Sequence, residues 1–143
     1  MSSDPVSDPR PWTVLYDEDC GFCRWSLGVV LRADRRRQLR PLALQSPEAQ
    51  RLLADLAPEE RMASWHLISP AGDRSSAGAA LPPLVALLPG GRLPAAGLAR
   101  IPELDERGYR WVAEHRSWFG HVIPERAKRR ADELIARRRA NMT

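Results

Sequence analysis

Two cysteines separated by two residues, Cys20 and Cys23, stand where a predicted strand gives way to a predicted helix, and this constrains the chain more than any other feature. The strand is the β-branched and aromatic run at residues 12–17, and it ends in the acidic stretch Asp17-Glu18-Asp19. Apolar residues then recur every three or four positions, which predicts an amphipathic helix over residues 20–36. A cysteine that opens a helix lies beside unpaired backbone amides and the positive end of the helix dipole, and both favour a thiolate. The chain is therefore predicted to carry a reactive dithiol.

Redox exchange is the chemistry that this spacing favours. With two residues between them, the sulfurs can close a disulfide across the first helical turn, so Cys20 can attack a substrate disulfide and Cys23 can resolve the mixed intermediate. The carboxylates of Asp17 and Asp19 oppose this, because negative charge destabilises a thiolate unless it points away or is paired with arginine. Two readings of these acids stay open: they depress the reactivity of the thiol, or they relay protons.

A structural or metal-binding role for the cysteines is the alternative to redox chemistry. A structural zinc site requires four ligands, usually at paired spacing in the sequence. The sequence has no second CxxC, and its three histidines, His66, His115 and His121, make no HxxxH pair. A Cys₄ site within one chain is therefore excluded. A mixed site of Cys20, Cys23 and a carboxylate or His66, a site shared by two chains, and inert packing stay open, whereas the favoured redox reading implies no metal and no organic cofactor.

The order of the remaining predicted elements indicates one α/β domain. With 143 residues, of which 43% are hydrophobic, the chain has the size and balance of a single domain. A second strand is predicted at residues 39–44, where Pro41 favours an edge position, and the stretch Ser46-Pro47-Glu48 starts a helix. Two further strands are predicted at 63–69 and 74–77, and helices at 79–88, 95–101, 104–119 and 125–141. The order is βαβαββ followed by helices.

The stretch Tyr16-Asp17-Glu18-Asp19-Cys20-Gly21-Phe22-Cys23 resembles the YDGDCGFC signature of the DCC family of thiol-disulfide oxidoreductases. Later segments that look like this family are Leu39-Arg40-Pro41-Leu42, the turn at Gly72, and Ile101-Pro102 through Tyr109, Val112-Ala113, Arg116 and Gly120. The resemblance covers roughly residues 12–120. It implies a thioredoxin-like βαβαββα fold, here with extra C-terminal helices, and an oxidoreductase that acts on the disulfide of a protein or a small molecule. It also implies that Tyr16, Asp17 and Asp19 support the Cys20–Cys23 site.

Two departures from the expected pattern bear on the loop and on the substrate. Glu18 stands where the family usually has glycine, so the loop before the cysteines must reach its conformation differently. Thioredoxin-like proteins usually place a cis-proline just before the third strand, facing the cysteines and helping to bind substrate backbone. Here residues 62–65 are Met-Ala-Ser-Trp. The reaction class is therefore better supported than a peptide substrate.

An arginine interrupts the apolar face of the predicted helix at 104–119. The residues that share this face by helical spacing are Tyr109, Val112, Ala113, Arg116 and Phe119. A guanidinium on such a face needs an acceptor, and one hypothesis is that Arg116 pairs with Asp17 or Asp19 and tunes the thiol indirectly. The alternative is an ordinary surface arginine.

Both ends of the chain are predicted to lie outside the domain of residues 12–120. Residues 1–11 are rich in Ser, Asp and Pro without the apolar core of a signal peptide, so a disordered lead is expected. Residues 121–143 are predicted to form a basic C-terminal helical extension, either a solvated helix or, less favoured, an arm for nucleic acid, an acidic partner or an anionic membrane surface. The formal net charge of +4 permits such contacts without demanding them.

The sequence thus predicts a thiol-disulfide oxidoreductase. A cytoplasmic location is expected, because no apolar stretch approaches the ~20 residues that cross a bilayer. Its expected partners are a disulfide-containing protein or a small thiol, together with a reductant whose identity the sequence leaves open. The alternative function is a non-catalytic binding module, in which the cysteines serve structure or metal and the basic tail docks on a partner.

Overall fold

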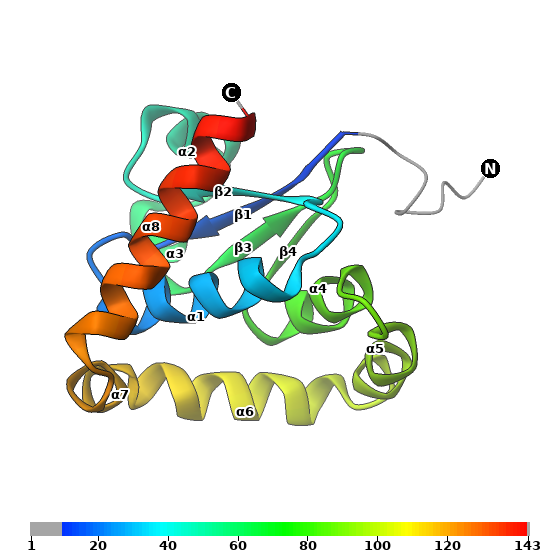
Figure 1. The fold of residues 1–143 in the computed structure, drawn as a ribbon. Coiled ribbons are helices and arrows are strands. Elements are labelled where there is room, and N and C mark those ends of the chain that lie inside the picture. Colours follow the sequence, from blue (N-terminus) through cyan, green and yellow to red (C-terminus); the bar gives the residue numbers. More distant parts are fainter. Residues whose placement is uncertain (1–9, 143) are drawn as a thin grey trace.

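A four-stranded mixed sheet organises the fold of the computed structural model, which describes residues 10–142 (Figure 1). The strands are β1 (Trp12–Tyr16), β2 (Leu39–Ala43), β3 (His66–Ile68) and β4 (Arg74–Ser76). They lie in the order β2-β1-β3-β4, with β2 parallel to β1, β3 antiparallel to β1, and β4 antiparallel to β3. Parallel neighbours need a crossover connection, and α1 (Gly21–Ala33) supplies it. This architecture confirms the predicted α/β class and is consistent with a thioredoxin-like fold. The edge position of β2 agrees with its proline.

Helices begin where the sequence supplies start signals. Ser46 caps α2, because its hydroxyl accepts a hydrogen bond from the Ala49 N–H at 3.2 Å, and Pro47 is the first helical residue. The remaining helical segments are α2 (Pro47–Leu52), α3 (Pro58–Ala63), the 3₁₀ turn η1 (Ala77–Ala80), α4 (Leu81–Leu87), α5 (Arg92–Ala99), α6 (Pro102–Glu114), α7 (Arg116–Val122) and α8 (Glu125–Met142).

Two stretches differ from the elements predicted above. The strand expected at 63–69 starts only at His66, because the residues before it form the short helix α3 behind Pro58. The helix expected at 104–119 is two helices, α6 and α7, which meet at His115. The backbone N–H of His115 donates to the Trp111 and Val112 carbonyls, and its Nδ1 lies 2.7 Å from the Trp111 carbonyl oxygen. These contacts end the first helix and let the chain change direction before Arg116.

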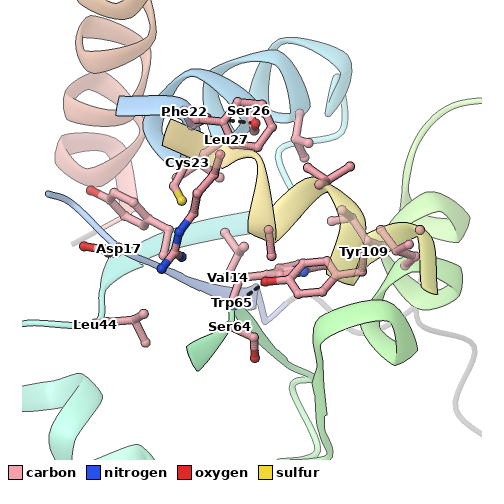
Figure 2. A pocket seen from close by; sticks show the side chains of 18 of the residues that line it. Val14, Asp17, Phe22, Cys23, Ser26, Leu27, Leu44, Ser64, Trp65 and Tyr109 are labelled. Carbon is pink, nitrogen blue, oxygen red and sulfur yellow. Dashed lines mark hydrogen bonds between the residues drawn. The ribbon is translucent and has the colours of Figure 1, made fainter. Parts of the chain in front are cut away.

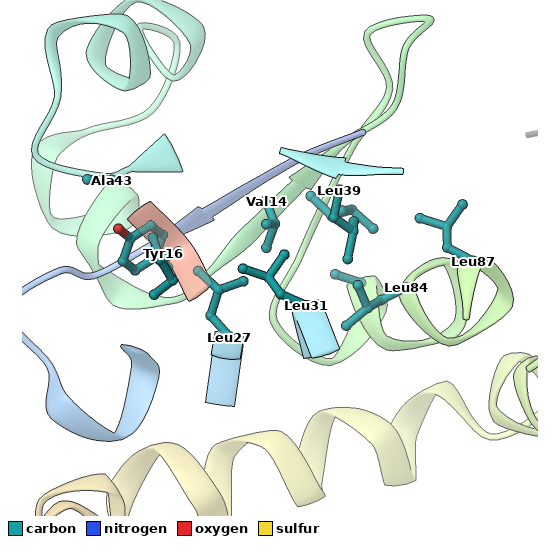
Figure 3. Close-up of a cluster of buried hydrophobic side chains, with 11 residues drawn as sticks. Val14, Tyr16, Leu27, Leu31, Leu39, Ala43, Leu84 and Leu87 are labelled. Carbon is teal, nitrogen blue, oxygen red and sulfur yellow. The ribbon is translucent and has the colours of Figure 1, made fainter. Parts of the chain in front are cut away.

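The main hydrophobic core lies between one face of the sheet and helices α1, α4 and α8 (Figure 3). Successive strand residues point to opposite faces, so Val14 and Tyr16 enter this core while Leu15 enters a smaller cluster on the other face. The main cluster consists of Val14, Tyr16, Leu27, Leu31, Leu39, Ala43, Leu67, Ala80, Leu84, Leu87 and Ile135. Packing against the sheet therefore holds α1, and with it the first turn of this helix, in place.

The C-terminal helix α8 packs along α1, so the predicted basic extension is docked on the rest of the chain through one face (Figure 1). Gly28 makes the close approach possible, because a Cβ on it would lie 2.5 Å from the Cβ of Ala131. Ile135 is part of the main core, and Arg24 pairs with Asp132 at 2.9 Å. The boundary expected at residue 120 falls inside α7.

Two further expectations concern the chain ends and membranes. The predicted lead of residues 1–11 lies outside the described residues up to position 9, and the structure begins just before β1. Within residues 10–142 no helix is both long enough and apolar enough to cross a membrane.

Candidate active site

Cys20 caps the N-terminus of α1. The chain leaves β1 at Tyr16, turns through residues 17–19, and reaches Cys20 with an extended backbone (φ −96°, ψ 111°). The Cys20 sulfur accepts a hydrogen bond from the backbone N–H of Cys23 at 3.3 Å, and the Cys20 carbonyl accepts one from Arg24 at 3.0 Å. A sulfur here occupies the place that a Ser or Asp oxygen takes in ordinary caps, so the helix start stabilises negative charge on it.

The two sulfurs form a close pair of free, half-buried thiols. The Sγ atoms lie 2.6 Å apart, with the Cys23 thiol donating to Cys20. The pKa of Cys20 is lowered to about 6, chiefly by this hydrogen bond. The Cys23 N–H and the Arg116 charge also lower it, whereas burial and the Asp17 charge raise it. The same hydrogen bond, together with burial, raises the pKa of Cys23 far above its ordinary value. Cys20 is therefore the thiolate of the pair near neutral pH, and Cys23 keeps the proton.

The loop before the cysteines is held by Gln45, which follows β2. The Gln45 side-chain amide donates to Asp17 Oδ1 at 2.6 Å and to Asp19 Oδ2 at 3.3 Å, and its carbonyl oxygen accepts from the Glu18 N–H at 3.3 Å. Asp17 Oδ1 also accepts from the Asp19 N–H at 3.0 Å. Glu18 has no positive φ, so the loop does not need the glycine usual in the family. The sequence carried no signal for Gln45, because its role depends on the pairing of β2 with β1.

Arg116 reaches the cysteines without the predicted partner. Among residues 10–142 it forms no ion pair with Asp17 or Asp19, and the carboxylates of these two acids are engaged by Gln45 instead. Arg116 is the first residue of α7 and lines the same cavity as Cys23. Its charge lowers the pKa of both thiols. The hypothesis of an Arg116–Asp pair is therefore wrong, and the guanidinium acts on the sulfurs themselves.

Tyr16 lies at the end of β1 and lines the cavity beside the dithiol. Its hydroxyl accepts a hydrogen bond from Arg139 of α8 at 2.5 Å, and the Arg139 guanidinium stands 5.5 Å from the ring centroid. Burial raises the pKa of Tyr16, and Arg139 opposes that effect. The C-terminal helix thus contributes a side chain to the surroundings of the site, which helical periodicity alone did not indicate.

A cavity of about 490 Å³ adjoins Cys23 (Figure 2). Its walls come from β1, α1, the segment before β3, α4 and α6, and they are mostly apolar. This volume lies within the range of small-molecule pockets, roughly 300–1,000 Å³. The sequence did not reveal the cavity, because its lining residues are scattered from Val14 to Arg116 and meet only in the folded chain.

The segment before β3, where thioredoxin-like proteins usually have a cis-proline, lines this cavity. Ser64 and Trp65 both line the wall, and Figure 2 shows them near Tyr109. The backbone N–H of Trp65 donates to the Tyr109 hydroxyl at 3.3 Å. This donor is therefore already engaged inside the protein and does not stand open to a substrate backbone.

The described residues do not form the mixed zinc site that the sequence left open. In the described part of the chain, no three His, Cys, Asp or Glu side chains gather as a metal site requires. His66 is fully buried, with Nδ1 2.6 Å from Ser76 Oγ and Nε2 3.0 Å from the Arg61 carbonyl oxygen. Both ring nitrogens are thus engaged in β3 and its surroundings, so His66 is a core histidine.

Comparison with known proteins gives one result. Residues 14–121 match the family model described as DCC1-like thiol-disulfide oxidoreductase. The match spans most of β1, the other three strands, and the helices up to α7, and it includes both cysteine positions. Neither a curated protein nor a solved structure gives a significant match to this sequence.

Proposed function

Because this chain belongs to the DCC1-like thiol-disulfide oxidoreductase family, we propose that it exchanges a Cys20–Cys23 dithiol with the disulfide of a substrate. The observation that carries the proposal is the capping geometry, in which the Cys20 sulfur receives hydrogen bonds from both the thiol and the backbone N–H of Cys23. A nucleophilic cysteine has to be a thiolate, and the pKa of about 6 makes Cys20 one at neutral pH.

The proposed reaction has two steps. The Cys20 thiolate attacks one sulfur of the substrate disulfide, which forms a mixed disulfide and releases the other substrate sulfur as a thiolate that takes a proton from solvent. Cys23 then loses its proton and attacks the Cys20 sulfur, which closes the Cys20–Cys23 disulfide and releases the second substrate thiol. The protein pair is oxidised by two electrons, and the substrate disulfide is reduced to two thiols.

The hydrogen bond between the two thiols supports this division of labour. While Cys23 donates to Cys20, its own proton is held and the thiolate is confined to Cys20. Once Cys20 is in a mixed disulfide, that acceptor is no longer negative, so the thiolate form of Cys23 becomes easier to reach. The close spacing of the sulfurs then leaves Cys23 with a short path to its target.

A redox titration tests the proposal. The protein is equilibrated in graded thiol buffers, its thiols are trapped by alkylation, and the oxidised fraction is fitted to a two-electron curve. A transition between roughly −120 and −270 mV is expected, the range of working oxidoreductases. A pair that forms no intramolecular disulfide in any buffer overturns the dithiol mechanism.

Substrate trapping provides the matched control. Cys23→Ser is expected to accumulate a mixed disulfide through Cys20, because the resolving thiol is gone. Cys20→Ser keeps one thiol at nearly the same place and is expected to accumulate none. Equal trapping by the two variants contradicts the assignment of Cys20 as the nucleophile.

The substrate, the cytoplasmic location and the docking of the basic tail stay predictions. For the tail, part of its charge serves the fold: Arg138 pairs with Asp34 and Arg139 binds Tyr16. Exposed cations of α8 are Arg126, Arg129, Arg130 and Arg137. Because the Cys20 sulfur accepts hydrogen bonds from both the thiol and the backbone N–H of Cys23, a binding module with inert cysteines has less support than the oxidoreductase.

A further inference from the structure

A group of aromatic side chains, here called the aromatic surface, lies on the outside of the protein beside the dithiol. It consists of Phe22, Trp111, Trp118 and Phe119. The Phe119 ring stacks on Phe22 with centroids 5.2 Å apart, and it makes edge contacts with Trp118 at 5.1 Å and with Trp111 at 5.9 Å. Trp111 is 55% exposed and Trp118 is 60% exposed. Contiguous apolar side chains exposed in this way mark an interaction site.

The aromatic surface is continuous with the dithiol. Phe22 stands between the two cysteines, so its ring belongs to the first turn of α1. Helix α7, which carries Trp118 and Phe119, packs against α1 (Figure 1). The approach is close, because a Cβ on Gly120 would lie 3.9 Å from the Phe22 backbone nitrogen. A substrate joined to the protein through Cys20 therefore lies at the edge of this surface.

The packing of the protein itself does not account for these rings. Among residues 10–142, the two hydrophobic core clusters contain none of the four. Helix α7 has no buried residue at all, although tryptophan and phenylalanine are two of its seven residues. Aromatic side chains that a core leaves outside are the ones that protein interfaces use most. The exposed rings are thus free to contact a partner.

The length of the aromatic surface favours a polypeptide as that partner. From Phe22 the surface continues to Trp118 in two ring-to-ring steps of 5.2 and 5.1 Å. An extended chain advances ~3.3 Å per residue, so side chains within about three residues of a cysteine bonded to Cys20 reach these rings. The backbone N–H of Trp65 is engaged by Tyr109, so side-chain contacts have to hold such a segment.

We propose that the aromatic surface docks a segment of a protein substrate that carries large apolar side chains close to its disulfide cysteine. This deepens the proposed function and rests on it, because the segment is bound while its cysteine meets Cys20. Apolar side chains gain contact area against the rings, whereas a polar segment loses hydration there without gaining hydrogen bonds. Trp111 and Trp118 are then the residues that determine which disulfides are preferred.

Two peptide disulfides that differ only near the cysteine test the proposal. The first is the symmetric disulfide of a capped seven-residue peptide, with leucine two residues before and two residues after the central cysteine. In the second, serine replaces both leucines. Glycine stands next to the cysteine in both peptides, so the two disulfides have the same intrinsic reactivity. The reduced protein converts each disulfide to two peptide thiols and is itself oxidised to the Cys20–Cys23 disulfide, a two-electron exchange.

The experiment measures single-turnover rates by acid quenching and alkylation. Each rate is divided by the rate of the same variant with bis(2-hydroxyethyl) disulfide, so that changes in the thiolate itself cancel. The leucine peptide is expected to react roughly tenfold faster than the serine peptide, a difference of about 1.4 kcal/mol. Trp118→Ala is expected to lower this preference several-fold, and the double variant Trp111→Ala/Trp118→Ala to abolish it. Trp118→Phe keeps an aromatic ring and is expected to retain most of it.

Leu93→Ala is the matched control. It removes a large apolar side chain that is 85% exposed in α5, at the other end of α6, and it is expected to keep the tenfold preference (Figure 1). Equal normalised rates for the two peptides in the unmodified protein, or a preference that survives the double substitution, overturn the proposal. A dimer in sedimentation that dissociates in the double variant also overturns it, because a second copy then covers the surface. Failure to reduce bis(2-hydroxyethyl) disulfide instead overturns the proposed function.

Discussion

Arg138 of α8 and Asp34, at the end of α1, form a buried ion pair between residues 104 positions apart in the chain. Arg138 Nη1 lies 2.7 Å from Asp34 Oδ2, and the two side chains are 11% and 0% exposed. The Asp34 carboxylate also accepts from the backbone N–H groups of Gln38 and Leu39. Arg138 donates in addition to the Leu39 carbonyl oxygen at 2.9 Å. The pair therefore joins the end of α1, the start of β2 and the C-terminal helix.

Removing Arg138 is expected to destabilise the protein strongly. Arg138→Met keeps the aliphatic stem but leaves the Asp34 charge buried without its cation, a change that typically costs about 3–5 kcal/mol. Arg137→Met removes an exposed arginine next to it in sequence and is expected to change the free energy of unfolding by less than about 0.5 kcal/mol. Urea unfolding of both variants measures the difference. Similar losses in the two variants would show that the buried pair contributes little.

The low pKa of Cys20 is expected to depend mainly on Cys23. In the reduced protein, the rate of Cys20 alkylation should rise with pH around a midpoint near 6. Cys23→Ala removes the donated hydrogen bond and should move that midpoint up toward the ordinary thiol value. Cys23→Ser keeps a donor at the same place, so its midpoint should stay lower than that of Cys23→Ala. An unchanged midpoint in Cys23→Ala would assign the shift to another cause.

The charge of Arg116 is expected to make a smaller contribution. Arg116→Gln removes a cation that favours the Cys20 thiolate, so the alkylation midpoint should rise, by less than in Cys23→Ala. Because charge–charge effects are screened by salt, the gap between Arg116→Gln and the unmodified protein should narrow at about 1 M salt. Arg110→Gln, which removes an exposed arginine of α6, provides the control and should leave the midpoint in place. A drop in the midpoint of Arg116→Gln would rule out the charge effect.

Burial of His66 predicts a loss of stability in acid. Burial lowers its pKa below the ordinary 6.5, so the folded protein holds the neutral ring while the unfolded chain takes up a proton. The resulting stabilisation is full above pH 6.5 and is lost as the pH falls below it. The folded pKa of Cys20 is also lowered, so this residue adds a free energy of unfolding that rises with pH between about pH 6 and 9.

The two contributions can be separated by substitution. His66→Asn is expected to be less stable at pH 7, because the contacts to Ser76 and Arg61 change, and to lose the slope below pH 6.5. His121→Asn alters an exposed histidine and should keep that slope. Denaturant unfolding from about pH 8 to 5 measures both. A slope that persists in His66→Asn would have to come from other groups.

The sequence by itself determined the local features of this protein. The β1 run, the start of α1 at Cys20, the Ser46 cap of α2 and the edge position of Pro41 were all predicted and are present. Each depends on residues within a turn or two of one another, where propensity, capping and periodicity act. The dithiol and its placement at a helix N-terminus were predictable for the same reason.

Only the tertiary structure decided how the surroundings of the dithiol are built. Three features join segments far apart in sequence: Gln45 in place of Arg116 as the partner of Asp17, Arg139 on Tyr16, and the cavity beside Cys23. Such contacts depend on strand pairing and on the packing of α6 and α8, which no local pattern specifies. The basic tail illustrates the difference, because its charge suggested a solvated helix. One face of this helix instead packs against the domain: Ala131 lies on Gly28, Ile135 enters the main core, and Arg138 pairs with Asp34.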